Sequence, residues 1–314
     1  MKGMVNTYTS TGIKLVNHPT VIRNIKIDKK ATPVSIQIAP TSRCNLNCVF
    51  CSNVNRDKHE DLELDLVLDA MKQLRTLGAK TVEWTGGGDP SLYENINEVI
   101  AVANMLGYKQ GFISNGVATK KMLSDSSLKK LTWLRISMNC LDYMDNIEIP
   151  RIDGTLGFSY VMNEKTKGNI LSKLDNYVAQ YNPSYVRIVP NCQSSDEEQE
   201  ENNKRFASMV HHWGYPYFYQ KKTFEKPERC WWGYFKPFLL HDGFVYPCSS
   251  VVLNADAERK FHEQYRITKI ENVEDLYKGN MVPFSSEHCN HCVFKTQNGI
   301  IESLVNPNGM EEFI

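Results

Sequence analysis

The sequence of 314 residues has no excess charge of either sign and no long hydrophobic run. Lys plus Arg and Asp plus Glu both number 36, so the formal net charge is zero. Sequence-independent nucleic-acid binding therefore gains no support from bulk charge. No apolar run reaches the length that spans a bilayer, and the first ten residues lack the apolar core of a signal peptide. We expect a cytoplasmic protein that does not enter a membrane.

Hydrophobic residues make up 41% of the chain and charged residues 23%, an ordinary globular composition. The length suits one large domain, or one large and one small. The chain has nine cysteines. In a reducing compartment, clustered thiols more often bind metal than form disulfides.

Three cysteines lie on one short segment, directly behind a strand-like run at 34–40. Cys44, Cys48 and Cys51 fall within eight residues. Fe–S clusters are bound by cysteines at such spacings, and three thiolates would leave the fourth iron of a cubane open for another ligand. The alternatives are a zinc knuckle, which normally needs four N or S ligands, or a disulfide with one cysteine left over.

Strand and helix patterns alternate from residue 34 onward, which predicts βα units around a parallel sheet. Strands are expected at 34–40, 81–85, 110–114, 134–138, 156–162 and 185–190. Helices are expected at 64–77, 95–106, 120–130, 168–181 and from Ser194 or Ser195 to about 213. Residues 1–32 form a polar arm with one possible strand at 20–27.

The spacing Cys-x-x-x-Cys-x-x-Cys, with Phe50 before the last cysteine, resembles the signature of the radical S-adenosylmethionine (SAM) enzymes. The resemblance implies an α/β fold, a partial (β/α)6 TIM barrel with chemistry at the carboxyl ends of its strands. It also implies that a [4Fe–4S] cluster on Cys44, Cys48 and Cys51 cleaves SAM reductively. The resulting 5′-deoxyadenosyl radical would abstract a substrate hydrogen. A reductant such as flavodoxin or ferredoxin is implied as a partner.

Several segments just past the predicted strands resemble the SAM-binding motifs of that family. Gly86, Gly87, Gly88 and Asp89 look like its Gly-Gly-Glu motif, which contacts the SAM amino group. Because Asp89 follows three glycines, either its carboxylate or only the backbone would make that contact. A plain turn is the alternative.

Four more strand ends supply the other expected SAM contacts. Asn115 stands in a Ser-Asn-Gly similar to the family's Thr-Asn-Gly. By resemblance, Ser137 and Ser159 would bond the SAM carboxylate or ribose, and Val189 and Pro190 would flank adenine. An Asn-Gly turn and hydroxyls satisfied inside the barrel are the structural alternatives.

A second cysteine set follows residue 221, where the βα rhythm stops. A β-hairpin turning at Asp242-Gly243 should carry one of its members. The set consists of Cys230, Cys248, Cys289 and Cys292. It resembles the twitch domain, the shortened form of the SPASM extension, and its spacing is similar to that of 2-deoxy-scyllo-inosamine dehydrogenases. The resemblance implies an auxiliary [4Fe–4S] cluster; a structural zinc site with four thiolates is the alternative.

The resemblance divides the chain into an arm (1–32), a radical SAM core (33–221) and a twitch-like α+β domain (222–314). The leading hypothesis is a redox modification of a peptide or small polar metabolite, such as oxidation, crosslinking or epimerisation, with the auxiliary cluster in electron transfer. Modification of a nucleotide or nucleic acid is an alternative, with the paired lysines at 129–130 and 221–222 as its only hints. A non-catalytic metal-stabilised binding or redox-sensing protein is another.

The pattern does not select a catalytic acid or base. His241, Tyr234 and Lys236 lie near the second cysteine set in sequence, but each also suits a packed aromatic patch. Cys140 and Cys192 follow two strand ends; most such thiols are small buried hydrophobes, and a catalytic thiol is the minority alternative.

Overall fold

The computed structural model describes residues 2–51, 53, 57–166, 168–222, 225, 228–252, 261–287, 289, 292–310 and 312. Within that part of the chain, ten strands form one sheet in the order β10-β9-β8-β1-β2-β3-β4-β5-β6-β7. Strands β1 to β7 run parallel, each beside the next in sequence. They are β1 (Ser35–Ala39), β2 (Thr81–Trp84), β3 (Lys109–Ser114), β4 (Trp133–Ser137), β5 (Thr155–Met162), β6 (Tyr185–Pro190) and β7 (Tyr217–Tyr219).

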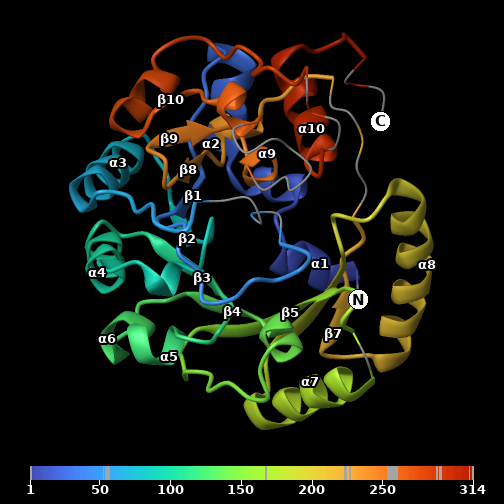
Figure 1. The fold of residues 1–314 in the computed structure, drawn as a ribbon. Helices are drawn as coiled ribbons and strands as arrows, with labels where there is room; N and C mark the ends of the chain where they lie inside the picture. Colours follow the sequence, from blue (N-terminus) through green and yellow to red (C-terminus); the bar gives the residue numbers. More distant parts are fainter. Residues whose placement is uncertain are drawn as a thin grey trace.

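Helices cover the outer face of these strands (Figure 1). They are α3 (Leu64–Thr76), α4 (Ile96–Met105), α5 (Thr119–Met122), α6 (Asp125–Leu128), α7 (Gly168–Tyr181) and α8 (Asp196–Trp213). In α3, Val67, Met71 and Leu74 are fully buried at helical spacing, which anchors the helix on the sheet. The structure thus confirms the partial α/β barrel that the alternating pattern predicts.

Two details of the barrel differ from the sequence prediction. The helix expected at 120–130 is two short helices, because the backbone is extended at Leu123 and the Ser124 hydroxyl then caps a new helix by accepting from the backbone N–H of Ser127. The sheet also gains β7, parallel to β6. Three residues are too few to show a strand pattern, so the sequence predicted only six barrel strands.

The strand predicted at 20–27 is wrong. This part of the arm is helical, with α2 (Pro19–Arg23) running into a wider helical segment at Asn24–Asp28. Val21 and Ile25 are both buried, and their spacing of four residues puts them on one helical face. The apolar residues of the segment therefore follow a helical period as well as a strand period.

The first helix of the arm, α1 (Lys2–Tyr8), lies inside the ring of strands (Figure 1). The ring of Tyr8 stacks on Tyr185 with centroids 4.2 Å apart, and the carbonyl oxygen of Tyr8 accepts a hydrogen bond of 2.8 Å from Nη2 of Arg135. Because Tyr185 is the first residue of β6, the arm packs against the amino ends of the strands.

The two faces of the parallel strands have different chemistry. Alternate residues such as Val82, Leu134 and Ile188 are fully buried beneath the helices. Their neighbours point into the barrel, where a cavity of about 450 Å³ is lined by polar side chains that include Arg135 and Arg187. The barrel interior is therefore a polar chamber, with the apolar core lying between the sheet and the helices.

The C-terminal part of the chain continues the barrel sheet. The predicted hairpin is confirmed as β8 (Phe238–Leu240) and β9 (Phe244–Tyr246), with Gly243 at φ +85° in its turn. β8 pairs in parallel with β1, and β10 (Thr268–Lys269) extends the edge. Two helices, α9 (Ser249–Val252) and α10 (Lys295–Val305), lie on this side of the molecule (Figure 1). Among the described helices, none has the length and apolarity needed to cross a membrane.

Candidate active site

The first cysteine loop lies at the carboxyl end of β1. Its three thiols are neighbours: burial, followed by the nearby Cys51 and Cys44, raises the pKa of Cys48 to about 12. The hydroxyl of Tyr143, beyond β4, accepts a hydrogen bond of 2.8 Å from the backbone N–H of Val49 and contacts Cys48. A metal centre would replace the Cys48 proton, since the thiolate is the ligand form.

The glycine run after β2 is locked against the start of this loop. The backbone N–H of Gly88 donates to the carbonyl oxygen of Thr41 across 2.9 Å, and that of Asp89 donates to the carbonyl oxygen of Arg43 across 2.7 Å. A Cβ on Gly88 would lie 2.0 Å from the same Arg43 oxygen. Only glycine fits this close approach of two loops, and such bare backbone leaves peptide groups accessible to a ligand.

Asp89 uses its carboxylate to hold loops together. The side chain is buried. Its Oδ1 accepts from the backbone N–H and hydroxyl of Ser91, at 3.0 and 2.6 Å. Its Oδ2 accepts from the backbone N–H of Asn115 at 2.7 Å and from the hydroxyl of Ser114 at 2.9 Å. With both oxygens engaged by the protein, the glycine backbone is the better candidate for the ligand contact.

Asn115 joins the end of β3 to the first cysteine loop. Its Nδ2 donates to Oδ1 of Asn45 at 2.7 Å and lies 3.7 Å from Sγ of Cys44, while its Oδ1 accepts from the backbone N–H of Val117. The amide thus orients a thiol of the loop, as outer-shell groups commonly do for metal ligands.

The other predicted contacts stand at the same end of the barrel. Ser137 is paired across the sheet with Ser159, and Ser159 with Arg187, so these three side chains share one level of the inner wall. Val189 and Pro190 end β6. Phe50 is half-buried next to Cys51.

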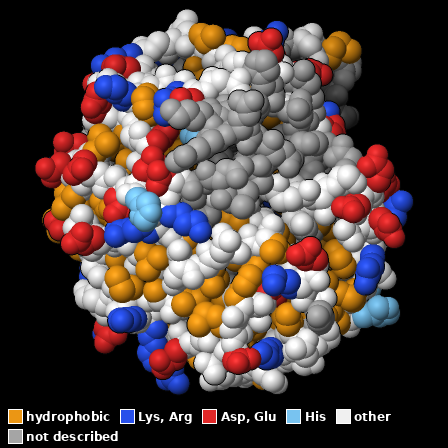
Figure 2. All heavy atoms as spheres, viewed as in Figure 1, with side chains coloured by type: hydrophobic (Ala, Val, Ile, Leu, Met, Phe, Trp, Pro, Cys, Tyr) orange, Lys and Arg blue, Asp and Glu red, His pale blue; other side chains and the backbone are white. Residues whose placement is uncertain are grey.

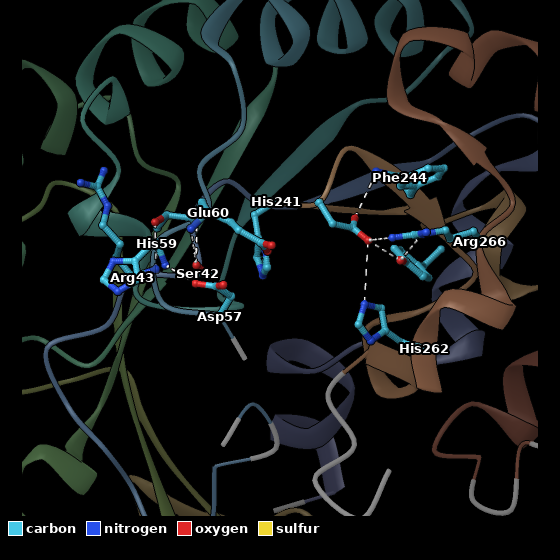
Figure 3. A network of polar contacts seen from close by, with 12 residues as sticks. Ser42, Arg43, Asp57, His59, Glu60, His241, Phe244, His262 and Arg266 are labelled. Carbon is cyan, nitrogen blue, oxygen red and sulfur yellow. Dashed lines mark hydrogen bonds and ion pairs between the residues drawn. The ribbon is translucent and has the colours of Figure 1, made fainter. Parts of the chain in front are cut away.

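A histidine from the C-terminal hairpin completes this region. His241 follows β8, and its Nδ1 lies 2.8 Å from Oε2 of Glu60 (Figure 3). A Cβ on Gly87 would lie 2.5 Å from Cδ2 of His241. The imidazole therefore packs on the glycine run. The sequence alone places His241 beside the second cysteine set, because no local pattern shows that β8 pairs with β1.

The second cysteine set converges on one pocket. Cys230, Cys248, Cys289 and Cys292 all line it. Burial, followed by the nearby thiols of Cys248 and Cys292, raises the pKa of Cys230 well above its ordinary value. Nδ2 of Asn298 lies 3.8 Å from Sγ of Cys292, and its Oδ1 accepts from the backbone N–H groups of Trp231 and Trp232.

The thiols of each set lie near one another but are not arranged at ligand distance around one metal ion. Among the residues that the structure describes, no three His, Cys, Asp or Glu side chains meet closely enough to ligate one metal ion. The donor chemistry of each set still fits iron–sulfur ligation: three neighbouring thiols beside a bare glycine backbone, and four thiols around one pocket.

The remaining candidates are not members of either cysteine set. Cys140 is fully buried, and this burial raises its pKa to about 12, as for a packing residue. Cys192 is exposed. The hydroxyl of Tyr234 donates to the carbonyl oxygen of Val282, and Nζ of Lys236 pairs with Glu83 at 2.8 Å in the barrel cavity.

Residues 38–148 match the family model described as the radical SAM superfamily. The chain is 29% identical over 155 residues to a GTP 3′,8-cyclase from Aquifex aeolicus, covering 45% of this chain and 47% of the relative. It is 29% identical over 118 residues to an S-adenosylmethionine-dependent nucleotide dehydratase from Lacinutrix mariniflava, covering 34% and 24%. The matches thus span less than half of these curated relatives.

Solved structures share the fold over most of the chain. SuiB of Streptococcus suis bound to S-adenosylmethionine has a TM-score of 0.57 at 13% identity, covering 89% of this chain and 75% of SuiB. anSMEcpe with bound AdoMet and a peptide has a TM-score of 0.53 at 14% identity, covering 79% and 81%. The barrel, the cysteine loop beyond β1 and the match over residues 38–148 agree: the chain contains a radical SAM domain.

Proposed function

We propose that this enzyme cleaves SAM reductively and abstracts a hydrogen atom from a small polar substrate held in the barrel cavity, in a net oxidation. The observation that carries the proposal is the joining of the first cysteine loop to the glycine run, at the carboxyl ends of strands that enclose a polar chamber. When bound, the cluster and SAM would supply a 5′-deoxyadenosyl radical that takes the hydrogen.

Residues of this chain would bind and orient the cofactor. Cys44, Cys48 and Cys51 would hold three irons, and Asn115 would steady the Cys44 thiolate. The peptide groups of Gly86 and Gly87 would meet the SAM amino group while Asp89 fixes the loop. Ser137 and Ser159, paired on adjacent strands, would bond its carboxylate or ribose, with Val189 and Pro190 beside the adenine.

An auxiliary [4Fe–4S] cluster on the second cysteine set is part of the proposal. Such a centre, with four thiolate ligands, supplies one-electron transfer and leaves no iron open for substrate. Val293 and Phe294 line both the four-cysteine pocket and the barrel cavity. Because one wall separates the two spaces, the auxiliary site is well placed to take an electron from a substrate radical. This arrangement favours an electron-accepting cluster over a structural zinc site at the second cysteine set, and therefore favours a net oxidation.

Redox-neutral modification of a nucleotide is the second candidate. The names of the relatives, a GTP 3′,8-cyclase and a nucleotide dehydratase, favour it. Mass spectrometry separates the outcomes, because oxidation removes two hydrogens, dehydration removes water, and cyclisation within one molecule leaves the mass unchanged. Because the arm packs into the amino end of this cavity, a peptide substrate would have to enter from the carboxyl ends of the strands.

The basic activity can be tested without knowing the substrate. Protein reconstituted with iron and sulfide under anaerobic conditions, given dithionite and SAM, should release 5′-deoxyadenosine. Cys48→Ala should abolish the release, and Cys192→Ala, which removes an exposed thiol outside both sets, should retain it. Release by Cys48→Ala equal to the unchanged protein would contradict the proposal.

A further inference from the structure

We propose that Arg187 and Lys222 bind a phosphate group of the substrate, so that the barrel cavity takes a phosphorylated small molecule such as a nucleotide. The inference rests on the proposed function, because it names the substrate class of the same chamber. It comes from the imbalance of charge in the cavity and from which of its cations already have partners.

The cavity wall is strongly cationic although the whole chain is neutral. Glu83 is the one carboxylate among the described residues that line it. The cationic residues on its wall are Lys14, Arg135, Arg187, Lys222 and Lys236. On the face shown in Figure 2, by contrast, acidic and basic side chains are interspersed around the rim. The positive charge is thus concentrated in the chamber, where low dielectric strengthens its pull on an anion.

Three of these cations already hold the arm or the sheet. Lys236 pairs with Glu83 and lies 3.1 Å from the hydroxyl of Ser10. Arg135 donates to the hydroxyl of Tyr185 at 2.9 Å and to the Tyr8 carbonyl oxygen. Lys14 donates to a backbone carbonyl oxygen within the arm. These contacts give each of the three a structural role.

Arg187 and Lys222 have fewer partners. Nη1 of Arg187 donates to Oε1 of Gln220 at 3.1 Å, while its Nε is buried without a hydrogen-bond partner. The carbonyl oxygen of Lys222 accepts from Nδ2 of Asn203, but its Nζ has no hydrogen bond or ion pair among the described residues. Burial, followed by repulsion from Arg187, lowers the pKa of Lys222 to about 8. For Arg187, burial is again the main cause and repulsion from Arg135 the second, and together they lower its pKa to about 9. An anion bound between Arg187 and Lys222 would offset the free-energy cost of burying each positive charge and of placing the two close together.

The chemistry of the pair fits phosphate. Arg presents a planar fork of donors that matches phosphate oxygens, and Lys adds a mobile point charge. The cavity of about 450 Å³ is in the range of small-molecule sites. Arg187 also stands in register with Ser159, a proposed SAM contact. A phosphate held at β6 would therefore leave the rest of a nucleotide-sized molecule within the chamber, near the SAM end.

Binding measurements on the anaerobically reconstituted full chain test the inference. GTP and inorganic tripolyphosphate are the probes, guanosine is the uncharged control, and calorimetry is run at low and high salt. We expect both anions to bind, with affinity that falls as salt rises, and guanosine to bind much more weakly. Arg187→Gln and Lys222→Gln should each lower the affinity for both anions by about tenfold or more.

Matched variants make the result specific. Lys204→Gln removes the same charge from an exposed position on α8, so it should bind like the unchanged protein. Arg187→Lys keeps the positive charge but loses the planar pair of guanidinium donors, so its affinity for both anions should lie between those of Arg187→Gln and the unchanged protein. A folding defect would not produce this order. Failure of both anions to bind at low salt, or equal affinities for Arg187→Gln and Lys204→Gln, would overturn the inference.

The test also separates this inference from the proposed function. If the unchanged protein releases 5′-deoxyadenosine from SAM but binds neither anion, the substrate class is wrong and the radical chemistry stands. If both anions bind through Arg187 and Lys222 but no SAM is cleaved, the anion site stands and the proposed function fails.

Discussion

Oδ2 of Asp89 accepts a hydrogen bond of 2.7 Å from the backbone N–H of Asn115. Through this bond and those to Ser91 and Ser114, one buried carboxylate ties the loop after β2 to the end of β3. Asn115 in turn contacts the first cysteine loop, so Asp89 sets the position of two loops that surround the proposed SAM site. Its role is one of positioning.

Asp89→Ala should lower the free energy of unfolding by about 3 kcal/mol, because it leaves several buried donors without an acceptor. Urea denaturation measures the change, and Asp153→Ala, at an exposed position, is the control. SAM affinity should weaken alongside stability. If Asp89→Asn instead lost SAM binding while its stability stayed unchanged, the carboxylate itself would be the SAM contact.

Gly87→Ala should impair SAM binding, because the new methyl group would meet the His241 ring at 2.5 Å. Removing that ring creates room, so the double variant Gly87→Ala with His241→Ala should regain part of the affinity. Equilibrium dialysis with labelled SAM measures both.

Gly88→Ala is the matched control for this rescue. Its Cβ would collide with the backbone oxygen of Arg43, which no side-chain substitution removes, so His241→Ala should not restore binding. Equal rescue at both positions would show that His241 does not set the space at Gly87.

The local features of the site could be predicted from sequence because they lie within short segments. The alternation of strand and helix patterns predicted the barrel, and the spacing of Cys44, Cys48 and Cys51 indicated the radical SAM domain that residues 38–148 match. Contacts made across the fold could not be predicted. His241 reaches Gly87 only because β8 pairs with β1, and Tyr143 reaches the cysteine loop from beyond β4. The free energy of such pairings depends on tertiary packing, which no local pattern reports.

The positive charge of the cavity could not be predicted from the sequence either. Arg187 and Lys222 are separated by 35 positions and come together only through the pairing of β6 with β7. Of the paired lysines that hinted at nucleotides, Lys222 lies on the cavity wall whereas Lys129 and Lys130 do not. A net charge of zero over the chain gave no sign of this local imbalance.

Cys289→Ala should remove about half of the iron from reconstituted protein, since one of two proposed [4Fe–4S] clusters would lose a ligand. SAM cleavage without substrate should remain measurable, because the first cysteine loop is unchanged. Iron analysis and 5′-deoxyadenosine release measure the two effects. Zinc bound to the unchanged protein and lost from Cys289→Ala would instead assign the second set to a structural zinc site.

His241, in the turn of the hairpin, and His262, in the helical turn Phe261–Tyr265, should make the protein less stable in acid. Burial lowers the pKa of His241 and of His262 below the ordinary value of 6.5, although the carboxylates of Glu60 and Asp242 act to raise the pKa of both. Arg266 and Glu263 also face His262, with lowering and raising effects respectively. Below about pH 6.5 the unfolded chain therefore binds protons more readily than the folded one, and stability falls as pH falls toward the folded pKa values.

His241→Gln removes one of these titrating groups, so its loss of unfolding free energy between about pH 7.5 and about pH 5.5 should be smaller than that of the unchanged protein. Urea denaturation at the two pH values measures this loss for each protein. Because the loss is a difference between two pH values, any effect of the substitution that does not depend on pH cancels. His212→Gln, at an exposed position on α8, should leave the pH dependence as it was. An equal loss in His241→Gln would mean that folding does not shift the pKa of His241. A larger loss would mean that Glu60 outweighs burial and favours the protonated imidazole in the folded protein.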